Sequence, residues 1–132
     1  MGASQRDAIA AGAAPDLPLS PAVRAGGLVF LTGMTGSGPD GAMPADPARQ
    51  FDAAFDKIAH VLAAAGLTLG DVVEMTSYHI DMARHFDRFE TCVRARLDAP
   101  FPAWTAVEVA GLRRPGALVE IRIVARDATA AS

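Results

Sequence analysis

The sequence has a single cysteine, Cys92, and one thiol cannot close an internal disulfide. No apolar run approaches the roughly 20 residues that a membrane-spanning helix requires. The first residues include the acidic Asp7 and contain no strong apolar segment, so they do not resemble a secretory signal peptide. Together these absences predict a protein of the cytoplasm, where thiols stay reduced, with no membrane contact.

An excess of basic residues is also missing, since 12 Lys and Arg face 15 Asp and Glu and the net charge is −3. Proteins that bind DNA or RNA usually present a basic face to the phosphates. The charge therefore argues against nucleic acid as a partner.

The 132 residues have the length of one domain, which can bury roughly two-thirds of the surface of the unfolded chain. Residues 1–16 are rich in Ala and Gly and poor in large side chains, which predicts a flexible leader. No internal repeat occurs, and we expect residues 17–128 to form a single domain.

Short apolar segments at 19–25 and 28–34 flank Gly26-Gly27, and this pattern predicts a hairpin. Residues 33–47 are rich in Gly and Pro and predict a loop. The glycines at 33–38 resemble a phosphate-binding loop, but the Lys-Ser/Thr pair of such a loop is missing and no helix follows directly. An ordinary flexible loop is the preferred interpretation.

Two amphipathic helices and a strand are expected next. Asp46-Pro47 provides an N-cap acceptor and a first-turn proline for a helix that ends at Gly66. Residues 71–80 are rich in Val, Thr, Tyr and Ile and predict a strand, and Asp81 is placed to cap a second helix that stops before Pro100. The expected core-facing positions of the helices are Phe51, Ala54, Phe55, Ile58, Leu62 and Ala65, then Phe86, Phe89, Val93 and Leu97.

The last two apolar segments, 100–109 and 117–125, alternate apolar and polar residues as half-buried strands do. The intervening Arg113-Arg114-Pro115-Gly116 has turn chemistry, so we expect an antiparallel hairpin. In its second strand the apolar side chains face one way and two charged ones, Glu120 and Arg122, face the other.

The element order is β-β-α-β-α-β-β, which predicts an α+β fold with one sheet and two helices on a single face. The uncovered face would expose too much apolar surface in a lone chain. We therefore expect a homo-oligomer, most simply a small ring.

The histidines and the cysteine offer little chemistry. His60 lies off the apolar stripe of the first helix, which predicts a solvated side chain, and no histidine has the spacing of a known metal motif. His79 and His85 could meet near a strand end, although a hydrogen-bonded surface histidine is the preferred interpretation of either. Cys92 is expected to be a small buried residue.

Glu120 is the best single candidate for catalysis because it interrupts an apolar strand. The alternative is a structural salt bridge, for example with Arg122. The outcome depends on strand register, because a slip of one residue reverses the two faces.

The chain resembles the RidA/YjgF family, the reactive-intermediate deaminases of enamines and imines. The matching residues near the carboxyl terminus are Phe101-Pro102-Ala103, Val107-Glu108-Val109, Leu112 and Val119-Glu120-Ile121. Those upstream, in the family's order, are Ala22-Val23, Gly26, Thr32-Gly33, Ala65-Gly66, Asp71-Val72-Val73 and Asp81. The resemblance extends over residues 18–126.

The resemblance implies a chorismate-mutase-like fold and a homotrimer with a small-molecule cleft between subunits. It implies hydrolysis of enamines and imines derived from amino acids to keto acids and ammonia, without cofactor or metal. Members have also been labelled endoribonucleases, which the acidic charge of this chain does not support.

The departures from the family pattern concern the site. Trp104 stands where such deaminases have an arginine that grips the substrate carboxylate, and an indole offers one N–H and no charge. Leu19 replaces a tyrosine, Glu90 aligns with an asparagine and Ala106 with a cysteine. With the retained Thr32 and Gly33, and with Thr105, these residues form the predicted substrate-binding set, and Glu120 is the implied general base.

Two functions remain open at this point. One is an enzyme in which Glu120 activates water and another cation, such as Arg113, Arg114 or Arg122, replaces the missing clamp. The other is a non-deaminating trimer that binds a small ligand, with Trp104 either stacking on that ligand or filling interface volume. RNA cleavage is a third and weaker alternative.

Overall fold

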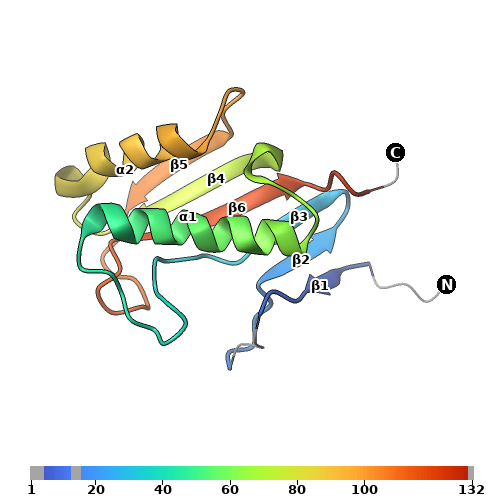
Figure 1. Ribbon diagram of the computed structural model, residues 1–132, viewed down its shortest axis with the longest axis horizontal. Coiled ribbons are helices and arrows are strands. Elements are labelled where there is room, and N and C mark those ends of the chain that lie inside the picture. The colour runs from blue at the N-terminus through green and yellow to red at the C-terminus, as the bar shows by residue number, and fades with distance from the viewer. Residues whose placement is uncertain (1–4, 13–15, 131–132) are drawn as a thin grey trace.

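The computed structural model describes residues 5–12 and 16–130. Six strands form one mixed sheet in the order β1-β2-β3-β6-β4-β5, and helices α1 and α2 lie side by side over one of its faces (Figure 1). The elements are β1 (Asp7–Ile9), β2 (Ala22–Ala25), β3 (Leu28–Leu31), α1 (Pro47–Ala64), a 3-10 turn (Leu69–Asp71), β4 (Val72–His79), α2 (Met82–Arg96), β5 (Ala103–Glu108) and β6 (Val119–Arg126). The α+β fold with two helices on a single face of one sheet is confirmed.

Strand β1 corrects the prediction for the amino terminus. Residues 7–9, expected in a flexible leader, pair antiparallel with β2, and Asp7 lies opposite Arg24. A backbone ladder needs no large side chains, and one apolar anchor, the buried Ile9, suffices to hold this short strand. The parts of the expected leader at 1–4 and 13–15 lie outside the described residues.

The first hairpin is confirmed. Ala25 pairs with Leu28 across a two-residue turn, and Gly26 and Gly27 both have positive φ, at 60° and 79°. Such a turn requires positive φ at both central residues, and glycine adopts it without strain.

Helix α1 begins and ends as predicted. The Asp46 carboxylate accepts a hydrogen bond from Arg49 N at 3.2 Å, and Pro47 occupies the first turn. Gly66, with φ of +80°, follows the carboxyl end of the helix. The apolar stripe is buried, and Phe51 and Phe55 are fully inaccessible.

Helix α2 begins where expected but is capped differently. Asp81 has a left-handed backbone, with φ of +52°, and its side chain makes no capping bond. A side-chain N-cap uses extended backbone, which this conformation excludes. Instead, Glu108 of β5 accepts the hydrogen bond of Met82 N through Oε2 at 3.1 Å.

The predicted hairpin of β5 and β6 is wrong. Strand β4 lies between them, parallel to β5 and antiparallel to β6 (Figure 1). Strands β4 and β5 are joined through α2, as parallel neighbours must be joined by a crossover. Alternation had identified both strands and the inward side of β6, but it carries no information about which strand is the neighbour.

The core lies between the helices and the sheet. The Phe89 ring packs edge-on against the Phe51 ring, with their centroids 5.2 Å apart. It also stacks on the Phe55 ring, with a centroid distance of 6.0 Å. Cys92, also on α2, is buried and donates to Asp52 Oδ1 at 3.2 Å. Burial and this carboxylate raise the pKa of the thiol to about 12, so the expected small buried residue is confirmed.

The opposite face of the sheet carries no helix. Phe30 pairs with Val124 there and keeps 36 % of its surface exposed, and Val107 keeps 37 %. Within the described residues, neither helix is both long and apolar enough to cross a membrane.

Candidate functional site

Glu120 is the second residue of β6 and lies between two fully buried residues, Val119 and Ile121. Because successive strand side chains alternate, Glu120 points away from the core that those neighbours fill. Its carboxylate passes directly over Gly33: a Cβ added to Gly33 would overlap Glu120 Oε2 and lie 2.8 Å from Cδ. A residue without a side chain is thus needed where the carboxylate lies.

Glu120 lines a pocket of about 700 Å3, within the range of roughly 300–1,000 Å3 that small-ligand sites occupy. It brings together four of the predicted site residues, namely Leu19, Thr32, Gly33 and Glu120. Three cations that come from α1 and from the loop before β6 also line it, namely Lys57, Arg113 and Arg114. A carboxylate beside basic groups is able both to accept a proton and to lie close to an anionic ligand.

Lys57 is the only lysine of the sequence, and sequence reasoning missed it. Its Nζ donates to Ser37 Oγ at 3.1 Å. Burial, followed by the charge of Arg114, lowers the pKa of Lys57 from its ordinary value of 10.5. The pattern of α1 does not predict that Lys57 lines a pocket, because most of the other residues of that pocket come from segments that are distant in the sequence.

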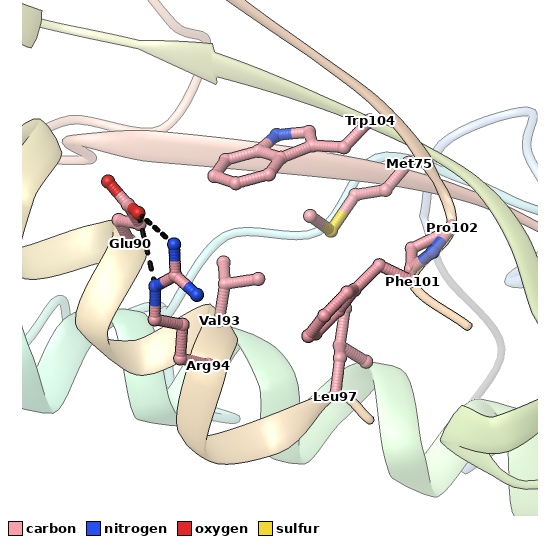
Figure 2. A pocket seen from close by; sticks show the side chains of 8 residues that line it. All are labelled: Met75, Glu90, Val93, Arg94, Leu97, Phe101, Pro102 and Trp104. Carbon is pink, nitrogen blue, oxygen red and sulfur yellow. Dashed lines mark hydrogen bonds and ion pairs between the residues drawn. The ribbon is translucent and has the colours of Figure 1, made fainter. Parts of the chain in front are cut away.

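Trp104 lies in a different place, on β5 beneath α2. It lines an apolar pocket of about 230 Å3, whose side chains Figure 2 shows. The other residues lining this pocket are Met75, Glu90, Val93, Arg94, Leu97, Phe101 and Pro102. Glu90 accepts two hydrogen bonds from the Arg94 guanidinium, at 2.8 and 3.1 Å, so its carboxylate is already paired.

The indole of Trp104 is held by the protein itself. Its Nε1 donates to Ser77 Oγ at 2.8 Å, and its ring stacks on Phe86 at 5.6 Å with an interplanar angle of 17°. The single polar group of this side chain is therefore engaged within the chain.

His79 is buried beside Ser77 and Phe86, the residues that hold Trp104, so the expectation of a surface histidine is wrong. It is 1 % exposed, its Nε2 lies 2.7 Å from Ser77 Oγ, and Phe86 and Phe89 pack edge-on against its ring. Burial lowers its pKa to about 4. His60 is exposed, as predicted, and no group of three or more His, Cys, Asp or Glu able to hold a metal occurs among residues 5–12 and 16–130.

The predicted site residues are thus not brought together in one place. Thr105 and Ala106 lie on β5 outside both pockets, and Thr105 faces away from Trp104. Glu120 lines one pocket and Trp104 the other, because the strands that carry them place these side chains on opposite faces of the sheet.

Comparison with known proteins bears on the meaning of this arrangement. A family model described as Endoribonuclease L-PSP matches residues 10–127. The chain is 40 % identical over 108 residues to the RutC family protein YjgH of Escherichia coli, covering 81 % of either chain. A solved structure of protein YjgH superposes with a TM-score of 0.84 at 35 % identity, covering 93 % of this chain and 97 % of that one.

Two further solved structures agree. Rv2704 of Mycobacterium tuberculosis, described as a member of the YjgF/YER057c/UK114 family, gives a TM-score of 0.79 at 34 % identity and covers 92 % of this chain and 98 % of its own. RidA of an Antarctic Psychrobacter gives 0.82 at 29 % identity, with 91 % and 98 % covered. The family match spans nearly all described elements, and the chain belongs to the Endoribonuclease L-PSP family, the group of the YjgF and RidA proteins.

Proposed function

We propose that this chain hydrolyses small imines, or enamines after tautomerisation, to keto compounds and ammonia, with Glu120 as the general base. The observation that carries the proposal is the Glu120 carboxylate in an open pocket, held over Gly33 and beside Thr32. Family membership supports the reaction class, since a relative of similar structure is named RidA.

The chemistry needs one base and one water. Water attacks the carbon of the C=N bond while Glu120 takes one of its protons. Glu120 returns that proton to nitrogen, and the carbinolamine collapses as its hydroxyl loses a proton and the C–N bond breaks. Glu120 takes that hydroxyl proton and passes it to the amino group, so nitrogen leaves as ammonia and the keto compound remains.

We further propose that the working site is a cleft between subunits of a homotrimer. Support comes from the separation of the two pockets, because Glu120 and Trp104 can contact one ligand only if each is supplied by a different subunit. The uncovered sheet face, with its exposed Phe30 and Val107, offers an apolar surface for such contacts.

The alternative function is a trimer that binds a small ligand without deaminating it. The observation that favours it is Trp104, whose N–H is engaged by Ser77 and whose ring packs on Phe86. A guanidinium at this position would grip a carboxylate with two hydrogen bonds, and the indole provides none.

An assay that generates 2-iminopropionate and follows ammonia release separates the two functions. We expect hydrolysis by the wild type and a loss of at least about a hundredfold in Glu120→Gln, the usual size of a general-base effect. Glu74→Gln, which changes an exposed carboxylate paired with Arg122, is the matched control and should keep full activity. An inactive wild type that becomes active on Trp104→Arg would establish the binding function instead.

A further inference from the structure

Three cations in the Glu120 pocket have no carboxylate partner among the described residues: Lys57, Arg113 and Arg114. Most other arginines of the chain are paired, with Arg24 on Asp127 and Arg126 on Asp71 as examples. Within the described residues, this pocket is therefore lined by three cations that, unlike those arginines, form no ion pair.

The walls of the pocket add hydrogen-bonding groups beside the ammonium. Ser37 Oγ accepts from Lys57 Nζ at 3.1 Å and from Thr35 Oγ1 at 3.2 Å. Both hydroxyl side chains are buried, with 4 % of Thr35 and 6 % of Ser37 exposed. Because the two lone pairs of Ser37 Oγ are used, its own proton remains available to donate to a ligand.

The loop that carries Arg113 and Arg114 is anchored to α1. Buried Gln50 accepts a hydrogen bond from Leu118 N at 2.6 Å and donates to Gly116 O at 3.1 Å. Gln50 thus fixes the carboxyl-terminal part of this loop against α1, the helix that carries Lys57, while Arg113 and Arg114 themselves are exposed.

The electrostatics of the pocket favour an anion. Burial, and after it the charge of Arg114, lowers the pKa of Lys57, so the ammonium is in an environment that disfavours its charge. The pocket also contains the carboxylates of Glu120 and Asp16, which are fewer than its cations, and neither lies within 4.0 Å of a basic nitrogen in the part of the chain described. An oxyanion bound between the cations would relieve their repulsion.

We propose that Lys57, Arg113 and Arg114 bind the oxyanion group of a small ligand, a carboxylate or a phosphate, and hold the rest of that ligand toward Glu120. The role of Glu120 in this arrangement rests on the proposed function, whereas the anion site does not. The grip lost at Trp104 is then supplied by different elements, α1 and the loop before β6.

Calorimetric titration of the full chain with 2-oxobutanoate and with inorganic phosphate tests the site and identifies the anion. We expect one of them to bind, and Lys57→Met and Arg114→Met to weaken it tenfold to a hundredfold, as loss of a charge-assisted hydrogen bond does. Arg88→Met, which removes an exposed arginine of α2 outside the pocket, is the matched control and should bind normally. Failure of both anions to bind at millimolar concentration, or unchanged affinity in the two variants, would overturn the site.

A second measurement needs no variant, because Lys57 is the only lysine. Reductive methylation of its ε-amine, read by mass spectrometry, should slow when the anion is bound, and equal rates with and without it would contradict the proposal. Glu120→Gln should abolish turnover yet keep anion binding. Turnover with unchanged KM in Lys57→Met would overturn the anion site alone, and intact binding without turnover would overturn the hydrolysis alone.

Discussion

A single missing Cβ decides where the candidate base of this protein can lie. The φ angle of Gly33 is not positive, so its backbone does not require glycine. The lack of a side chain is required because the Glu120 carboxylate occupies the place that a Cβ would take. The contact is with the far end of a flexible side chain, which can rotate away at little cost in stability.

We therefore predict that Gly33→Ala displaces Glu120 and lowers imine hydrolysis at least tenfold, while the free energy of unfolding changes by about 1 kcal/mol or less. Gly111→Ala is the matched control, because a Cβ there meets nothing within 4 Å. Ammonia release and urea unfolding of both variants provide the comparison, and full activity in Gly33→Ala would contradict the placement of Glu120.

His79 makes the stability of the fold depend on pH. Its pKa is about 4 in the folded chain and 6.5 when unperturbed, so between these values the unfolded state binds a proton that the folded state does not. The contribution of the neutral His79 to the free energy of unfolding is fully present above pH 6.5 and is lost as the pH falls toward 4. The loss amounts to about 3 kcal/mol.

Urea unfolding from pH 4 to pH 7.5 measures this dependence. In His79→Gln the part of the slope between pH 4 and 6.5 that belongs to this residue should disappear. His60→Gln, at an exposed position, should retain the slope of the wild type. A wild-type slope in His79→Gln would refute the assignment.

At this scale the sequence predicted some residues and not others. The outward direction of the Glu120 side chain and the burial of Cys92 agree with strand and helix periodicity. His79 and Lys57 do not follow from such periodicity, because their surroundings come from α2 and from the loop before β6, far away in the chain. A pattern within one element cannot report what another element places against it.

Among the elements, α2 depends on a residue outside it. Glu108 at the end of β5 accepts the hydrogen bond of Met82 N and brings a negative charge to the amino end of the helix. The helix start is therefore tied to the strand that follows it.

We predict that Glu108→Ala lowers the free energy of unfolding by about 1 kcal/mol, the usual cost of a lost N-cap. Asp81→Asn should change it by about 0.5 kcal/mol or less, because Asp81 makes no capping bond and asparagine tolerates a left-handed backbone. Chemical denaturation of the two variants makes the test, and the reverse order of effects would show that Asp81 is the cap.

The strands show what periodicity can and cannot predict. The β2–β3 hairpin was predictable because Gly26 and Gly27 encode its turn locally. The pairing of β5 could not be predicted in this way. Its neighbour β4 precedes it in the chain by the whole of α2, and residues 109–118, which connect β5 to β6, cross the end of β4. Local chemistry specifies tight turns, whereas the order of strands is decided by the packing of the entire sheet.

For the whole molecule we predict a trimer of this chain. Light scattering at micromolar concentration should give three times the mass of one chain. Phe30→Asp places a charge on the open sheet face and should shift the population toward monomer, whereas Ala83→Asp, on the exposed side of α2, should not. A monomeric wild type would remove the argument for a cleft shared between subunits.

The burial of Cys92 and its hydrogen bond to Asp52 have a practical consequence for labelling the protein in solution. The thiolate is the form that reacts with maleimides and disulfides, and a pKa of about 12 leaves on the order of one thiol in 100,000 ionised at neutral pH. The natural chain thus behaves chemically as if it had no cysteine. A cysteine introduced at an exposed position of a loop or of the sheet edge would accept a fluorescent or spin label selectively, without any change to the native core.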